Sequence, residues 1–148
     1  MTDIEEINAL AARYSDAVSR LDALAAAATY AEDGVLKGFD FPEIRGRAQI
    51  ADVLGQTLVR LSFLSQQCTG GMPSVDGDRA VARWNVQEWN QITGEEKLSA
   101  CFGIYEDELV RTAQGWRFAR RRFHALWRGR VEAAGKLYGP TPIEHPEL

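Results

Sequence analysis

The feature that most constrains this chain is an amphipathic helical pattern at its start, in the stretch from Thr2 to Gly34. Apolar residues recur there every three or four positions, at Ile4, Ile7, Ala11, Tyr14, Val18 and Leu21. This spacing gathers their side chains on one face of a helix. Thr2 followed three residues later by Glu5 predicts a capping box at the helix start.

A second, alanine-rich helix is predicted from Ala23 to Ala31, directly after the first. Asp22 is expected to be its N-cap, and Asp33-Gly34 to end it, because glycine readily adopts the left-handed conformation found at helix ends. Two consecutive helices with apolar faces need a large apolar surface to cover. The only candidate for that surface is the strand-rich second half of the chain.

The later segments show strand and turn patterns around one more helix. Gly46 precedes a helical pattern that runs to about Leu61. The expected strands are Val35 to Phe39, Ser62 to Thr69, Arg79 to Ile92, Lys97 to Arg111 and Trp116 to Arg128. Turn signals at Asp76-Gly77, Thr93-Gly94 and Gln114-Gly115 join the long strands into an antiparallel meander. Helices followed by a meander predict an α+β fold.

Composition limits the classes of function. A length of 148 residues suits one domain, and 45% hydrophobic with 26% charged residues is ordinary for a globular protein. We expect no membrane span and a cytoplasmic location. We also expect no signal peptide, because the first residues are acidic and a signal peptide begins with basic ones. Cys68 and Cys101 are too few for a disulfide framework or a metal site. A net charge of −4 gives no general attraction to nucleic acid or to an anionic membrane.

One long strand suggests a carboxylate inside the fold. Between Arg79 and Ile92 the alternate residues on the more apolar face end in Glu88 and Asn90. If this face points toward the helices, Glu88 is desolvated, its pKa rises, and it becomes suited to proton transfer. The alternative is that the strand end is frayed and Glu88 is hydrated.

The last strand carries Arg120, Arg121 and Arg122, so the alternation takes arginine to both faces of the sheet. Such a run is either an anion-binding cluster or an exposed edge that partners acidic residues. At least one arginine must point inward or into an interface, where it needs a partner because burying an unpaired charge is costly. His124 is the only histidine within the predicted core, and no second histidine suggests a metal pair.

Phosphate loops, nucleophile elbows, paired metal-ligand motifs and dinucleotide fingerprints are absent from the sequence. The order of elements resembles the nuclear transport factor 2 superfamily, and most closely its SnoaL-like branch and the scytalone dehydratases. The resemblance covers most of residues 4–128 and rests on four segments: Tyr14 to Asp22, Tyr30 to Gly34, Gly46 to Ile50, and Gly115 to Ala119.

This resemblance implies a cone-shaped roll, in which a curved, mostly antiparallel sheet surrounds the N-terminal helices and an internal pocket. It also implies small-molecule chemistry without a metal or organic cofactor. The titratable positions of the dehydratases match Ser19, Gln67 and Asn90, all of which are neutral here. These side chains can hydrogen-bond a ligand but cannot exchange protons near pH 7, so the dehydratase reaction itself is in doubt.

Two functions therefore stay open. One is a lyase or isomerase, dehydratase-like, acting on a small cyclic or polyketide-like compound, with Glu88, His124 and Tyr14 as catalytic candidates. The other is a ligand-binding protein without catalysis, in which Tyr14 only fills the core. In either case the expected ligand is neutral, and the residues expected to bind it are Val18, Ser19, Gln67, Val86, Asn90 and Tyr105.

Assembly and the C-terminal tail complete the expectations. The outer sheet face should carry Trp89 or Trp84, depending on register, and an exposed aromatic patch often marks an interface. We expect a homo-oligomer, a dimer before a trimer. The single domain spans residues 1–148 with a core at about 3–128, and residues 129–148 form a tail. A helical turn at 128–135 and anchors at Leu137, Tyr138 and Ile143 suggest a pocket lid or an interface arm, with disorder as the alternative.

Overall fold

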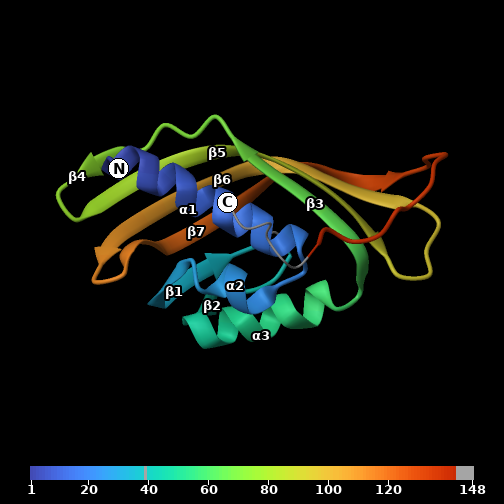
Figure 1. Ribbon diagram of the computed structural model, residues 1–148, viewed down its shortest axis with the longest axis horizontal. Coiled ribbons are helices and arrows are strands. Elements are labelled where there is room, and N and C mark those ends of the chain that lie inside the picture. Colours follow the sequence, from blue (N-terminus) through green and yellow to red (C-terminus); the bar gives the residue numbers. More distant parts are fainter. Residues whose placement is uncertain (39, 143–148) are drawn as a thin grey trace.

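The computed structural model describes residues 1–38 and 40–142, and it has the expected α+β architecture (Figure 1). The helices are α1 (Asp3–Ser19), α2 (Ala23–Ala27) and α3 (Arg47–Leu58). The strands are β1 (Tyr30–Lys37), β2 (Ile44–Arg45), β3 (Leu61–Thr69), β4 (Ser74–Asp76), β5 (Arg79–Ile92), β6 (Leu98–Thr112) and β7 (Gly115–Val131). They form one curved sheet in the order β2-β1-β7-β6-β5-β3, with β4 beside β5.

The long helix α1 begins as its sequence predicts. The Thr2 hydroxyl accepts a hydrogen bond from the Glu5 amide at 3.2 Å, and the Glu5 carboxylate accepts one from the Thr2 amide at 2.7 Å, so the capping box is present. The buried residues of α1 are Ile7, Leu10, Ala11, Tyr14, Ser15, Ala17 and Val18. This face packs on the concave side of the sheet, whereas Ile4 at the first turn stays exposed (Figure 1).

The second helix is shorter than predicted, because the chain enters β1 at Tyr30 instead of continuing to Ala31. Parallel pairing of β1 with β7 overrides the helix propensity of the alanine run. Gly34 does not end a helix but lies in the strand, where the register shifts between Tyr30 and Val35. A Cβ at Gly34 would lie 2.9 Å from the Ala31 carbonyl oxygen, so this close approach needs glycine.

The third helix ends at Leu58, and β3 begins at Leu61, which the sequence pattern assigned to the helix. Gly55 faces α2, where a Cβ would lie at an ordinary van der Waals distance of 3.8 Å from the Ala23 Cβ. The predicted strand from Val35 ends at Lys37, and its last residue, Phe39, lies outside the described residues.

The meander of β5, β6 and β7 is confirmed, with glycines of positive φ at its two turns, Gly94 and Gly115. Gly77, also of positive φ, lies in the turn from β4 into β5. On β5 the residues facing the core are Ala80, Ala82, Trp84 and Val86, as the alternation predicts. The last strand extends to Val131, which pairs with Leu98 of β6. The predicted helical turn at 128–135 is therefore wrong, because continued pairing with β6 keeps the chain extended.

The expectation of an inward arginine is confirmed by Arg121. Its guanidinium binds the Asp107 carboxylate through two hydrogen bonds, of 2.8 and 2.7 Å, and both side chains are fully buried. The neighbouring Arg120 pairs with Glu43, and Arg122 is exposed on the outer face opposite Glu106.

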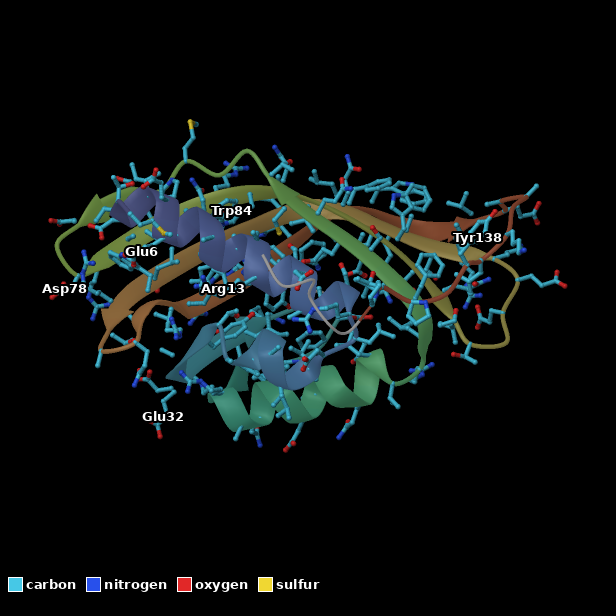
Figure 2. The ribbon with its side chains drawn as sticks, in the orientation of Figure 1. Glu6, Arg13, Glu32, Asp78, Trp84 and Tyr138 are labelled. Carbon is cyan, nitrogen blue, oxygen red and sulfur yellow. The ribbon has the colours of Figure 1, made fainter. Side chains whose placement is uncertain are left out.

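None of the helices among residues 1–38 and 40–142 has the length and apolar character that a membrane crossing requires. After Val131 the described tail contains neither helix nor strand. The expected anchors Leu137 and Tyr138 are exposed, and Ile143 lies outside the described residues. Tyr138 and Asp78 lie at opposite ends of the molecule's long axis (Figure 2).

Candidate functional site

A cavity of about 470 Å³ lies between the helices and the concave face of the sheet. Most of its wall is apolar and includes Val18, Leu36, Leu54, Leu58, Leu64, Val86 and Phe123. The polar groups that reach it from the interior are Tyr14, Gln66, Glu88, Asn90 and Tyr105. A pocket of this kind, apolar with a few convergent polar groups, is the usual form of a small-molecule site.

Glu88 is the one carboxylate deep in this cavity among the described residues that line it. Strand β5 turns it inward, where it lies opposite Cys101 of β6. One carboxylate oxygen accepts a hydrogen bond from Gln66 Nε2 at 3.1 Å, and the other accepts one from Asn90 Nδ2 at 3.1 Å. Burial raises the pKa of Glu88 above its ordinary value, because desolvation outweighs the two amide hydrogen bonds and the charge of Arg128.

Gln66 connects the polar groups of the cavity, and the sequence did not single it out. Its carbonyl oxygen accepts a hydrogen bond from the Ser15 hydroxyl at 3.2 Å. Its amide nitrogen lies 3.1 Å from the Glu88 carboxylate and 3.5 Å from the Tyr105 hydroxyl. The base candidate and a phenol are thus separated by a single amide group.

The expected ligand contact at Gln67 is wrong by one residue. Gln66 pairs with Glu88 across β3 and β5 and shares its face, whereas Gln67 pairs with Gln87 and is exposed on the outer face. Since successive strand residues alternate between faces, a shift of one position exchanges inside and outside. The buried Leu64 two residues earlier is the signal that identifies Gln66 as the inward residue.

Ser19 also differs from its expected role, because it does not line the cavity. It is the last residue of α1, and its hydroxyl accepts a hydrogen bond from the backbone N–H of Gln66 at 3.0 Å. This bond joins the helix end to β3. The expected neutral set of Ser19, Gln67 and Asn90 therefore does not converge, and only Asn90 lines the cavity.

Tyr14 of α1 and Tyr105 of β6 line the cavity together, as do Val18 and Val86. The two phenol rings meet edge to face, with centroids 6.1 Å apart. Burial raises the pKa of Tyr14 and raises that of Tyr105 well above its ordinary value, so both hydroxyls are protonated near neutral pH. Each is therefore a potential hydrogen-bond donor to a ligand oxygen.

His124 lies outside the cavity, which excludes direct participation there. Its side chain is 44% exposed on the outer face and pairs with Glu106 at 3.2 Å. The reason is a register shift in β7, where Leu109 pairs with Phe118 but the adjacent Glu108 pairs with Arg120. This bulge inverts the alternation, so that Arg121 and Phe123 point inward and His124 points outward.

The mouth of the cavity carries charge that local sequence patterns did not reveal. Arg128 binds Asp40 at 2.7 Å, and both residues line the cavity. Cys101 lies on the wall between this pair and Glu88, and burial raises the pKa of its thiol. Within the described part of the chain, no three His, Cys, Asp or Glu side chains are arranged to hold a metal ion.

Comparisons with known proteins agree with this architecture. The model of the SnoaL-like domain matches residues 1–122. No curated protein matches the sequence. An NTF2-like protein with a cystatin-like fold from Novosphingobium aromaticivorans is 32% identical over 84% of this chain and 82% of its own, with a TM-score of 0.71.

Two further structures are named after enzymes. A protein provisionally named scytalone dehydratase from Novosphingobium aromaticivorans is 19% identical over 97% of this chain and 94% of its own, with a TM-score of 0.79. A ketosteroid isomerase-like protein from Erwinia carotovora atroseptica is 26% identical over 84% and 97%, with a TM-score of 0.70. With a family match over most of its length and a pocket enclosed by the same cone-shaped roll, the chain belongs to the SnoaL-like family of the nuclear transport factor 2 superfamily.

Proposed function

We propose that this protein is a lyase or isomerase that removes a proton from a carbon next to a carbonyl group, without a cofactor. The observation that carries the proposal is the position of Glu88. A desolvated carboxylate with a raised pKa lies one amide away from the buried phenol of Tyr105, in an apolar cavity. A base and a hydrogen-bond donor so close together suit enolate chemistry.

In the proposed reaction Glu88 accepts the proton, and the electron pair of the broken C–H bond moves toward the carbonyl oxygen. The hydroxyl of Tyr105 or Tyr14 donates a hydrogen bond to the developing oxyanion. If the ketone carries a C=C bond next to that carbon, the resulting dienolate takes the proton back from Glu88 at the far end of the conjugated system, which is isomerisation. If it carries a β-hydroxyl group, the enolate expels that group, which leaves as water with that proton. The amides of Gln66 and Asn90 hold the carboxylate throughout.

The substrate class follows from the cavity walls. A volume of about 470 Å³ and a largely aliphatic and aromatic lining suit a small cyclic or polyketide-like ketone. Among the described residues, the interior of the cavity offers one carboxylate and otherwise amide, thiol and phenol groups, so the part of the substrate near Glu88 is neutral. The names of the compared dehydratase and isomerase-like structures are consistent with this class of reaction.

The test uses 2-tetralone, a bicyclic ketone with acidic α-hydrogens, and follows hydrogen–deuterium exchange by NMR in D₂O. We expect wild-type protein to accelerate exchange, and Glu88→Gln to reduce the rate about 100-fold or more, the usual range for loss of a general base. Tyr105→Phe and Tyr14→Phe should each lower it, the larger loss identifying the donor. His124→Gln is the matched control on the outer face and should leave the rate unchanged.

The second candidate is a ligand-binding protein without chemistry. It is favoured by the two amides that occupy both oxygens of Glu88, an arrangement that also suits plain recognition. If wild-type protein binds 2-tetralone but does not catalyse exchange, and Glu88→Gln binds it equally well, this function replaces the enzymatic one. Exchange at the wild-type rate in Glu88→Gln would contradict the assigned base directly.

A further inference from the structure

A buried guanidinium lies behind the two tyrosines of the cavity. The Arg121 side chain is 0% exposed, and its Cζ atom lies 4.0 Å from the ring centroid of Tyr105 and 4.7 Å from that of Tyr14. The ring of Phe118 covers it at 3.9 Å. Arg121 does not line the cavity, so it cannot touch a ligand there.

The cation is held in this place by a buried carboxylate. Asp107 accepts two hydrogen bonds from Arg121, and its Oδ2 atom also accepts one from Trp84 Nε1 at 2.8 Å. These contacts come from three strands of the meander, β5, β6 and β7. The plane of the guanidinium is therefore set by the sheet rather than by the helix that carries Tyr14.

Stability alone is a weak explanation for such a pair. Desolvation of two charges often cancels their attraction, and apolar residues of similar volume frequently replace a buried ion pair without loss of stability. A cation against the face of a phenol, by contrast, stabilises negative charge on that ring. It therefore strengthens the hydroxyl as a donor to an oxyanion.

We propose that Arg121 is a positioning residue for the reaction, acting through the rings of Tyr14 and Tyr105 to strengthen their hydroxyls as hydrogen-bond donors. The role in turnover rests on the proposed function, whereas the effect on the phenols does not. Asp107 fixes the orientation of the guanidinium and partly balances its charge. The ring of Phe118 covers the guanidinium and excludes water from it.

The surroundings of the two phenols define what a titration must resolve. Burial raises the pKa of both tyrosines, and the charge of Arg121 acts against that rise. Hydrogen bonding with Tyr105 also lowers the pKa of Tyr14. Ionised neighbours raise the pKa as well: Tyr14 and Tyr30 act on Tyr105, Glu88 acts on Tyr14, and Cys68 acts on both. Titration must therefore be compared between variants that leave those groups intact.

The experiment replaces Tyr14 or Tyr105 site-specifically with 3,5-difluorotyrosine, whose phenol titrates at accessible pH, and follows its ionisation by absorbance. The test variant is Arg121→Met with Asp107→Asn, in which the asparagine oxygen still accepts the Trp84 N–H. The matched control is Arg122→Met with Glu106→Gln, an outward pair on the same two strands that removes the same charges. Circular dichroism verifies the fold of each variant.

We expect the test variant to raise the phenol pKa by about one unit or more, a tenfold change in ionisation, as removal of a nearby opposite charge does. The control should leave it unchanged. Exchange of 2-tetralone should slow about tenfold in kcat with little change in KM. Arg121→Gln, which retains an amide donor for Asp107, is the second variant and should shift the phenol in the same direction.

An unchanged phenol pKa in both Arg121 variants would overturn the proposal and leave Arg121 a purely structural residue. A raised pKa with unchanged kcat would overturn its part in the reaction. If wild-type protein catalyses no exchange, the proposed function fails, but the titration still decides whether Arg121 strengthens the two donors.

Discussion

At the scale of single residues, Glu88 shows how burial creates reactivity. The side chain follows a run of apolar residues on the inner face of β5, and the neighbouring amides of Gln66 and Asn90 offset only part of the lost hydration. The carboxylate is therefore held in a form that takes up a proton more readily than one in water. The same burial that makes Glu88 a stronger base also lowers the stability of the folded protein when the carboxylate is ionised.

That cost gives a pH-dependent prediction for stability. The pKa of Glu88 is higher in the folded protein than in the unfolded chain. The protonated form therefore contributes to stability when the pH lies below the unfolded-state pKa, and this contribution is lost as the pH rises through the folded-state pKa. Glu88→Gln should therefore melt at a higher temperature than wild type near pH 8, and the gap should narrow toward pH 4. Thermal melts across this range measure it, and a gap independent of pH would contradict the buried, raised-pKa state.

The rate of 2-tetralone exchange should show the complementary dependence. Glu88 acts as a base only when ionised, so the rate should rise with pH through its raised pKa and then level off. The pH–rate profile of wild type and of His124→Gln should coincide, since His124 lies on the outer face. A shift of the profile in His124→Gln would show that the histidine contributes after all.

At the scale of elements, the end of α1 and strand β3 depend on each other. The hydroxyl of Ser19 accepts a hydrogen bond from the backbone N–H of Gln66. The side chain of Gln66 reaches Glu88 inside the cavity only if β3 keeps this position beside α1. Close backbone approaches elsewhere are filled by glycine, at Gly34 in β1 and Gly103 in β6. Contacts between elements, rather than propensity within them, position the polar groups of the cavity.

We predict that Ser19→Ala destabilises the protein by about 1 kcal/mol, the usual net value of one hydrogen bond. It should also raise the KM for 2-tetralone, because β3 carries Gln66 into the cavity. Ser65→Ala is the matched control, since Ser65 is an exposed serine of the same strand. Urea unfolding gives the free energies, and equal effects of the two variants would argue against the link between α1 and β3.

Two glycine substitutions should have opposite signs. Gly55→Ala in α3 should stabilise by about 1 kcal/mol, because alanine favours helix and its Cβ would meet Ala23 at an ordinary 3.8 Å. Gly103→Ala should destabilise by about 1–3 kcal/mol or prevent folding, because a Cβ there would lie 2.3 Å from the His124 carbonyl oxygen. Chemical denaturation of both variants checks the pair, and similar values for them would contradict the close approach of β6 to β7.

At the scale of the whole molecule, the outer face of the sheet presents an aromatic cluster of Trp89, Phe102 and Trp127. The ring centroids of Trp89 and Phe102, and of Phe102 and Trp127, are 5.7 Å apart, and Trp127 is 47% exposed. Trp84, the alternative considered from sequence, is buried, and its Nε1 donates a hydrogen bond to Asp107. We propose that the cluster joins two copies of the chain, since such patches commonly form interfaces.

Light scattering after size exclusion at micromolar concentration tests this assembly. We expect a dimer for wild type and a monomer for Trp127→Glu. The new carboxylates of the two copies would face each other across the interface, where they repel and lose hydration. Leu24→Glu, at an exposed leucine of α2, is the control and should remain dimeric. A monomeric wild type would refute the proposed interface.

The sequence alone determined the elements whose signals are local. The capped helix, the glycine turns, the long meander strands and the need for a partnered inward arginine all follow from spacing and side-chain chemistry within a few residues. Strand alternation named Glu88 but left open whether its carboxylate is buried or hydrated. Only the tertiary structure decided which of two adjacent strand residues faces the cavity. The bulge in β7 exchanged His124 for Phe123, and the register of β3 with β5 exchanged Gln67 for Gln66. Strand alternation has a period of two, so one unpaired residue, set by contacts between distant strands, inverts the side chains that follow it until a second register shift restores the alternation, as happens in β7 between Ala125 and Trp127.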